Sequence, residues 1–202
     1  TKRVLAVDPL TGASSLVVAF ELPYAVDMMP PHPSEDYFLF GSRGDDFPEG
    51  SAAFVVGRDG SIRRADFERR WHRLRFSKRP DQRLFFNFDE PREQFSILPD
   101  GTDRYSIPRS GSHPDWTTNG AELTFYHEGK VWGIQYDGTG IREIINIGGG
   151  GHGGPCLDGT WFVSDQKGGD FANSVFWFRT DGSQIAHILS KHDSAYYSHT
   201  TL

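Results

Sequence analysis

The strongest constraint on this chain is an internal repeat of about 40 residues. Similar blocks open at His32, His72, His113 and His152, and His199 stands where a fifth block would begin. The steps between successive histidines are 40, 41, 39 and 47 residues. A period of this length indicates a fold in which one supersecondary unit stacks on the next, because a single unit cannot bury its apolar faces alone.

A second series of turn signals interleaves with the histidines. Each block carries an Asp-Gly pair after a strand-like apolar run, and a further turn lies earlier in the block. Asp-Gly and Asn-Gly are typical central pairs of tight β-hairpins. Two hairpins per block predict four short antiparallel strands, which is the composition of a β-propeller blade. The pairs are Asp59-Gly60, Asp100-Gly101, Asp137-Gly138 and Asp181-Gly182, and the further turns include Asn119-Gly120 and Asp158-Gly159.

We therefore expect an all-β chain, a β-propeller of four-stranded antiparallel blades, as a single domain over residues 1–202. The N-terminal run VLAVDPLTG supplies one hairpin, and about four full blades follow. A closed ring needs its last blade completed, so we expect an incomplete part, about four to five blades, of a larger ring. Segment 65–74, ADFERRWHRL, is the place where one or two helical turns compete with strands.

Charge and composition narrow the classes of partner. The 21 Lys and Arg against 27 Asp and Glu give a formal net charge of −6, which argues against a nucleic-acid binder because phosphate contacts need a basic surface. No apolar run approaches the roughly 18 residues that cross a bilayer, so no membrane partner is expected. The single cysteine, Cys156, excludes an internal disulfide framework and a multi-cysteine zinc site. An anionic ligand would therefore need a local basic patch or a metal ion.

Residues 61–83 form such a basic patch, with nine basic side chains against three acidic ones. This reversal of charge favours a polyanion such as an acidic oligosaccharide. The alternative is a solvated face whose arginines pair with neighbouring carboxylates. Segment RWHRLRF is expected to be a strand that carries Arg73 and Arg75 on one face and Trp71 on the other.

The repeated histidines are the strongest candidates for chemistry. In a propeller, the first strands of successive blades start near the axis, so their histidines could reach one ion or one substrate. The alternative for each is a hydrogen bond to a neighbouring blade, but for His113 and His152 together we favour function. Trp116, close to His113, is assigned a sugar-stacking role, while the other strand tryptophans are expected in the core. The glycine-dense run 148–154 is interpreted as a loop with close backbone approach, or as room for a ligand.

Three blocks carry a likeness to known propellers: HRLRFSKRPDQRLFFNFDEPREQFSILPDGT (72–102), SHPDWTTNGAELTFYHEG (112–129) and GHGGPCLDGTWFVSD (151–165). They resemble consecutive blades of the oligogalacturonate lyases, seven-bladed propellers that act on short pectic fragments. The likeness spans about residues 70–202. The HPDW pattern is also similar to blades of TolB-type translocation propellers and of the prolyl-oligopeptidase and dipeptidyl-peptidase propeller domains.

The resemblance implies β-elimination from a uronic acid. In that family a base removes the proton next to the carboxylate, and a manganese ion held by histidines and a glutamine stabilises the charge that develops. By position, His113 matches the base, His152 the first Mn²⁺ ligand and His199 a later ligand. The family's arginine falls at or beside Glu93, so Arg92 is assigned to the substrate carboxylate.

Tyr196 stands where the glutamine ligand would fall, so the ligand set is incomplete in this chain. Ulvan-type lyases on similar propellers use His and Tyr without such a metal site, in which case Tyr196 or Tyr197 would act as acid or base. The first hypothesis is thus a polysaccharide lyase whose acidic oligosaccharide contacts Arg73, Arg75, Trp116 and Tyr196. The second is a non-catalytic TolB-like propeller that binds a protein or peptide.

Overall fold

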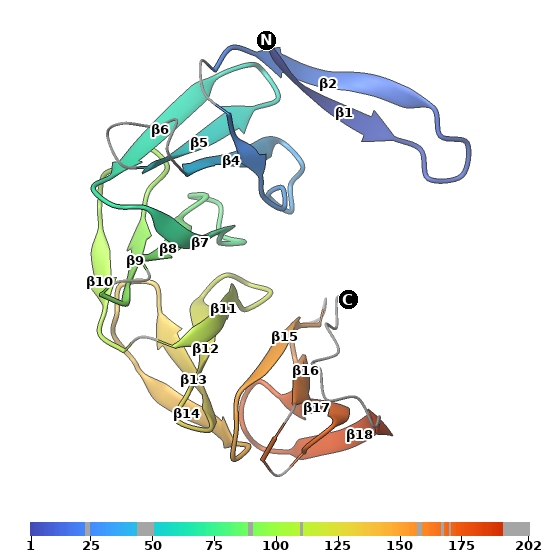
Figure 1. Ribbon diagram of the computed structural model, residues 1–202, viewed down its shortest axis with the longest axis vertical. Helices are drawn as coiled ribbons and strands as arrows, with labels where there is room; N and C mark the ends of the chain where they lie inside the picture. The colour runs from blue at the N-terminus through green and yellow to red at the C-terminus, as the bar shows by residue number, and fades with distance from the viewer. Residues whose placement is uncertain are drawn as a thin grey trace. The chain divides into compact units, whose positions relative to one another are not determined.

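The computed structural model consists of strands joined by turns, with no helix in the described residues (Figure 1). The structure describes residues 1–22, 25–43, 51–88, 91–109, 111–156, 159–166, 168–169 and 171–191, with the backbone alone at 43 and 185–191. Accordingly, this part of the chain offers no helix that could cross a membrane. The all-β prediction is confirmed.

Four sheets of the described chain have four strands each, and in each sheet the strands lie side by side in sequence order. The fifth sheet is the two-stranded antiparallel hairpin β1–β2. This meander of four strands is the blade that the two turn series predict. The strands are β1 (Lys2–Val7), β2 (Ser14–Phe20), β3 (Asp27–Met28), β4 (Tyr37–Arg43), β5 (Ser51–Gly57), β6 (Ile62–Phe67), β7 (Trp71–Phe76), β8 (Leu84–Phe88), β9 (Glu93–Ile97), β10 (Tyr105–Ile107), β11 (Ser112–Trp116), β12 (Glu122–His127), β13 (Lys130–Gln135), β14 (Arg142–Asn146), β15 (Gly151–Pro155), β16 (Trp161–Gln166), β17 (Ser174–Arg179) and β18 (Ile185–Lys191).

Residues 65–74 are strands and a turn, not the helical turns that the sequence left open. They include the end of β6 and the start of β7, joined by residues 68–70. Ala65 and Phe67 are both buried on β6, and this two-residue spacing is typical of a strand. The segment therefore links one blade to the next.

The Asp-Gly pairs close the last hairpin of each blade. The aspartate carboxylate accepts hydrogen bonds from the backbone N–H and the hydroxyl of the Ser or Thr two residues later. The glycine between them has a φ of 85°, 84°, 83° or 75°, which side chains other than hydrogen disfavour. The predicted turn series is thus confirmed. The turns are Asp59-Gly60-Ser61, Asp100-Gly101-Thr102, Asp137-Gly138-Thr139 and Asp181-Gly182-Ser183.

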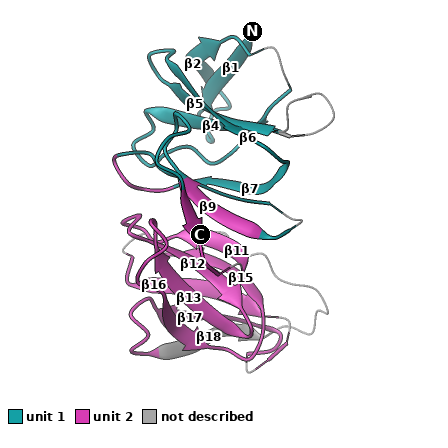
Figure 2. Ribbon diagram, turned by 90° about the vertical axis from the view of Figure 1, so that its left-hand side faces the viewer, with its two compact units in different colours: residues 1–76, 81–92, 97–104 teal, residues 77–80, 93–96, 105–202 magenta. Residues whose placement is uncertain are grey.

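The chain forms two compact units (Figure 2). Unit 1 comprises residues 1–76, 81–92 and 97–104, and unit 2 comprises residues 77–80, 93–96 and 105–202. Neighbouring sheets pack on each other inside each unit, which buries apolar faces that a single sheet would leave in water. The core of unit 1 contains Val4, Val18, Phe20, Phe38, Phe40, Ala52, Phe54 and Val56. The core of unit 2 contains Tyr126, Val131, Ile144, Ile145, Ile147, Phe162, Phe176 and Phe178.

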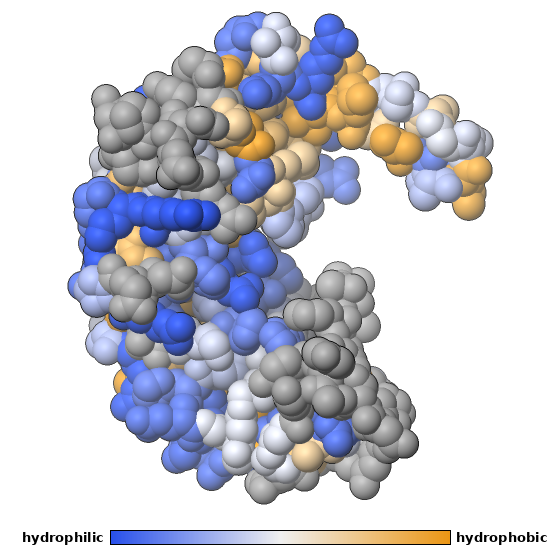
Figure 3. Space-filling view, viewed as in Figure 1, coloured by the Kyte–Doolittle hydropathy of each residue, from blue (hydrophilic) through white to orange (hydrophobic). Residues whose placement is uncertain are grey.

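The β1–β2 hairpin contributes to the core of unit 1 through only part of its length. Leu5 and Leu16, which face each other across the two strands, are exposed, as is Leu10 in the turn. Apolar surface is accordingly visible along this hairpin in Figure 3. Isolated exposed apolar side chains are common in proteins, so this surface by itself indicates no partner.

Candidate functional site

Three of the repeated histidines occupy matching positions. His72, His113 and His152 are each the second residue of the first strand of a sheet, and that strand lies at the sheet's edge. His32 differs, because it follows β3 instead of starting a strand. It is buried and packs edge-on against Phe76 at a centroid distance of 5.5 Å. The expectation that His32 belongs to the strand-start series is therefore wrong, and His199 lies outside the described residues.

His113 and His152 come together in unit 2. They stand on the edge strands β11 and β15 of neighbouring sheets, and the centroids of their rings are 3.9 Å apart with an interplanar angle of 70°. At this separation both imidazoles can reach one substrate group or one ion. The prediction that histidines of successive blades converge is confirmed for this pair.

The backbone at His113 is unusual. Its φ is 51°, in the left-handed region that costs a non-glycine residue on the order of 1 kcal/mol. The register between β11 and β12 shifts between Ser112 and Asp115, which is the signature of a β-bulge that changes the direction of a side chain. Such local strain is typical of functional positions, because the surrounding structure must maintain it.

A buried carboxylate holds His152 in place. Asp165 on β16 is fully buried at 0% exposure, and its Oδ1 accepts the backbone N–H of His152 at 2.8 Å and lies 3.2 Å from the ring Nδ1. The strand register produces these contacts, since His152 pairs directly with Asp165. A carboxylate here favours the tautomer with a proton on Nδ1, so Nε2 is the nitrogen that would act on a ligand.

The glycines around His152 permit this close packing. A Cβ atom at Gly151 would lie 2.2 Å from the Asp165 carbonyl oxygen, and one at Gly153 would lie 2.1 Å from the Val163 carbonyl oxygen. Both would be severe clashes, so only glycine fits. The expected close backbone approach is confirmed, although residues 151–155 form a strand and not a loop.

Buried polar groups continue behind the two histidines. The Tyr126 hydroxyl and the Ser164 hydroxyl are 2.6 Å apart. Burial raises the pKa of Tyr126 well above its usual value, and the charges of Asp165 and Asp115 raise it further. Tyr126 is therefore a neutral hydrogen-bonding group that supports the site, not a base.

The part of the chain that the structure describes contains no group of three or more His, Cys, Asp or Glu side chains that could hold a metal ion. His152 does have the surroundings of a metal ligand, because a carboxylate on Nδ1 is the usual outer partner of a ligating histidine. The other predicted ligand, His199, and Tyr196 lie outside the described residues. Among the described residues, His152 is therefore the predicted ligand whose surroundings suit a metal ion.

A second candidate region lies wholly in unit 1. An open cavity of about 250 Å³ is lined by β7 and Met29. Of the side chains that line it, His72, Arg73 and Arg75 carry or can carry positive charge, and none is acidic. The expectation that both arginines lie on the face opposite Trp71 rests on strand alternation, but simple alternation puts residues 71, 73 and 75 on one face. The placement is as expected for a different reason, because the register shift between Trp71 and Arg73 introduces an extra residue.

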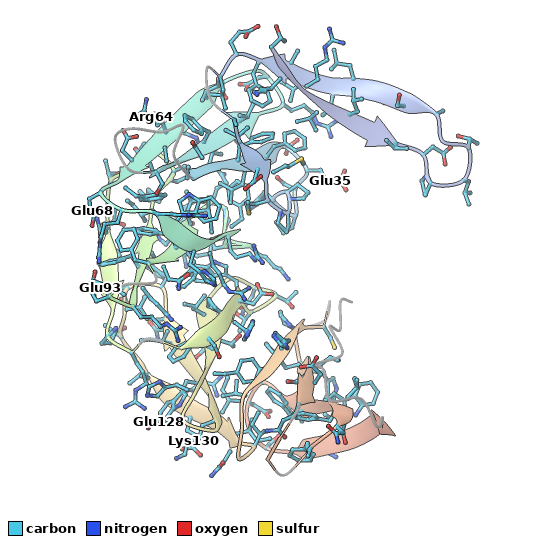
Figure 4. The ribbon with its side chains drawn as sticks, in the orientation of Figure 1. Glu35, Arg64, Glu68, Glu93, Glu128 and Lys130 are labelled. Atoms are coloured by element: carbon cyan, nitrogen blue, oxygen red, sulfur yellow. The ribbon has the colours of Figure 1, made fainter. Side chains whose placement is uncertain are left out.

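The rest of the basic patch is largely occupied by structural contacts. Arg64, which Figure 4 labels on β6, pairs with Asp66 at 2.6 Å. The guanidinium of Arg69 lies 4.2 Å from the ring centroid of Phe88, and Arg83 is buried against Asp103. The alternative interpretation, a face of paired arginines, therefore describes these residues, and Arg73 and Arg75 are the ones that line a cavity.

The remaining predicted residues have different surroundings. Arg92 is exposed in the turn before β9. Trp116 is fully buried, and its indole N–H has no hydrogen-bond partner among the described residues. A ring at 0% exposure is not accessible to a sugar, so Trp116 belongs to the core, where large aromatic side chains fill the space between sheets.

Asp165 is a site residue that the sequence did not single out. A signal was present: Asp165 lies as far after the Asp158-Gly159 pair as His152 lies before it. A hairpin centred on that pair places the two residues opposite each other. Residue 158 lies outside the described part of the chain, but the observed register agrees with this pairing.

Comparison with solved structures identifies the architecture. The chain superimposes on an oligogalacturonate lyase in complex with manganese with a TM-score of 0.71 and 14% identity, over 97% of this chain and 61% of that one. The oligogalacturonate lyase from Vibrio parahaemolyticus gives 0.69 and 11%, over 95% and 61%. TolB from Acinetobacter baumannii gives 0.63 and 12%, over 96% and 50%. The fold is a β-propeller.

These identities show the fold alone, and the chain spans about 61% of each of the two lyases. No family model matches the sequence, and no curated protein matches it. The similarity nevertheless agrees with the resemblance found in the sequence, since both point to oligogalacturonate lyases and to TolB propellers.

Proposed function

We propose that this chain cleaves a uronate-containing oligosaccharide, oligogalacturonate-like, by β-elimination. The observation that carries the proposal is the pair of imidazoles 3.9 Å apart, one on a strained bulge and the other held by a buried carboxylate. Candidate proton-transfer groups in fixed geometry are what such a reaction requires. The fold that the chain shares with oligogalacturonate lyases supports the same class of reaction.

In the proposed reaction, His113 is the base. Its imidazole accepts the proton at C5 of the sugar, the electrons of that C–H bond form the C4–C5 double bond, and the C4–O bond breaks. The leaving oxygen then takes up a proton from solvent. Removing this proton is difficult because charge accumulates on the neighbouring carboxylate, so a positive group must face that carboxylate.

The positive groups are proposed residue by residue. Arg92 would contact the carboxylate of the reacting sugar, and Arg73 and Arg75 would bind carboxylates of an acidic oligosaccharide. His152, together with His199, would hold a Mn²⁺ ion, and such an ion would supply further positive charge to the carboxylate. We propose Tyr196 as a substrate contact. Trp116 is not proposed as one, because the Trp116 ring is buried.

The test uses the double bond of the product, which absorbs in the near ultraviolet. We expect the protein to produce this absorbance from oligogalacturonate, and His113→Ala to lower the rate by about 10²- to 10⁴-fold, the usual contribution of a general base. The matched control is His127→Ala on β12, whose ring lies 3.5 Å from the exposed carboxylate of Glu128, and it should keep the wild-type rate. No absorbance with pectic, ulvan and glycosaminoglycan substrates would reject the lyase.

The alternative is a TolB-like propeller that binds a protein or peptide. The similarity to TolB favours it to nearly the same degree as the similarity to the lyases. The two functions predict different sites, because a small anionic ligand needs convergent histidines and arginines, whereas a protein partner needs an apolar rim. The histidine pair in unit 2 favours the first.

A further inference from the structure

The cavity beside β7 is positively charged in a chain whose net charge is negative. The chain as a whole carries a net charge of −6, yet His72, Arg73 and Arg75 line this cavity of about 250 Å³ and no carboxylate of the described residues does. Both arginines are half-buried, so water weakens their attraction for an anion less than it would at a fully exposed position. The cavity is therefore suited to a negatively charged ligand.

Local contacts fix the position of this strand. The backbone N–H of Arg73 donates to the side-chain oxygen of Asn87 at 3.0 Å, and Asn87 is itself buried. The guanidinium of Arg75 donates to the Leu74 carbonyl at 3.1 Å and lies 3.9 Å from the sulfur of Met29. Groups that are held before the ligand arrives lose less conformational entropy on binding.

We propose that this cavity binds a single uronate residue through its carboxylate, with Arg73 and Arg75 as the hydrogen-bond donors and His72 at its edge. Guanidinium groups match the geometry of a carboxylate, and the half-buried Met29 lines the same cavity. The inference rests on the proposed function for its ligand class, but it concerns binding in unit 1 and not the reaction.

The experiment compares two sugars that differ only in the carboxylate. Methyl α-galacturonoside and methyl α-galactoside are titrated into the full chain at pH 7, and binding is followed by calorimetry or NMR. We expect the acid to bind at least tenfold more tightly than the neutral sugar. Arg73→Gln and Arg75→Gln should each lower the affinity for the acidic sugar by about tenfold, since each removes a charge-assisted hydrogen bond. The affinity for the neutral sugar should stay unchanged.

The control is Arg64→Gln on β6, which removes the same charge from an arginine that pairs with Asp66 outside the cavity. It should not alter the affinity. Equal binding of the two sugars, or equal weakening by all three substitutions, would overturn the subsite. Neither sugar can be cleaved, because neither carries a sugar at C4. If binding depends on Arg73 and Arg75 but oligogalacturonate is not cleaved, the binding site is supported and the lyase function is rejected.

Discussion

At the scale of single residues, Asp165 determines what His152 can do. Its carboxylate contacts both the backbone N–H and the Nδ1 of His152, and its Oδ2 has no partner in the described chain. Asp165→Asn keeps an oxygen that can accept the Nδ1–H but removes the charge, whereas Asp165→Ala removes both. We expect a rate loss of about 10- to 100-fold for Ala, as for other outer partners of histidine, and a smaller loss with a shifted pH profile of kcat/KM for Asn.

The control for Asp165 is Asp137→Asn, the same change in an exposed turn. There the carboxylate contacts Thr139, so the pH profile should stay that of the wild type. A wild-type profile for Asp165→Asn as well would show that Asp165 is structural only.

At the scale of elements, the Asp-Gly-Ser/Thr turns make the free energy of unfolding depend on pH in the acid range. The hydroxyl of Thr102, and then its backbone N–H, donates to Asp100, which lowers the pKa of this carboxyl below its ordinary value. A pKa lowered by folding adds stability above the unfolded value of 3.8, and this stability disappears as the pH falls through the folded value. We expect the free energy of unfolding to decrease in that acid range, and to decrease less in Asp100→Asn, as measured by urea unfolding at several pH values.

The substitution Thr102→Val tests how much of the acid dependence comes from the hydroxyl that donates to Asp100. Thr102→Val removes the hydroxyl but leaves the carboxylate and the backbone N–H, so part of the acid dependence should persist. If Asp100→Asn and the wild type lose stability in parallel from pH 7 to pH 2, the turns do not contribute to it.

The same elements show which features of the fold and the site can be predicted from the sequence. The turn residues repeat, so the strands, the sheet order and the convergence of His113 with His152 follow from spacing alone. The bulges could not be predicted, because the left-handed φ of His113 lacks the glycine or asparagine that usually signals it. Burial of Trp116 was also hidden, since an aromatic residue near a strand end fits a core and a binding surface equally well.

At the scale of the whole molecule, the catalytic proposal depends on sheet packing. His113 and His152 stand on separate sheets of unit 2, so the core between those sheets, together with the Tyr126–Ser164 contact, keeps the rings in contact. Phe178 is fully buried in that core and stacks on Phe162 at a centroid distance of 5.1 Å. We expect Phe178→Ala to lower the free energy of unfolding by about 3–5 kcal/mol. On heating, this variant should lose its activity at a lower temperature than the wild type.

The comparison for this substitution is Leu10→Ala in the exposed turn of the β1–β2 hairpin. Leu10 is 94% exposed, so its removal should change the free energy of unfolding by less than about 0.5 kcal/mol. The thermal midpoint and the rate of product absorbance are measured together for both variants. Because the two imidazoles are far apart in sequence and meet through the contacts between two sheets, activity in Phe178→Ala should fall in step with the loss of folded protein. Activity that outlasts the thermal transition would mean that the histidine pair does not need the two sheets to be packed.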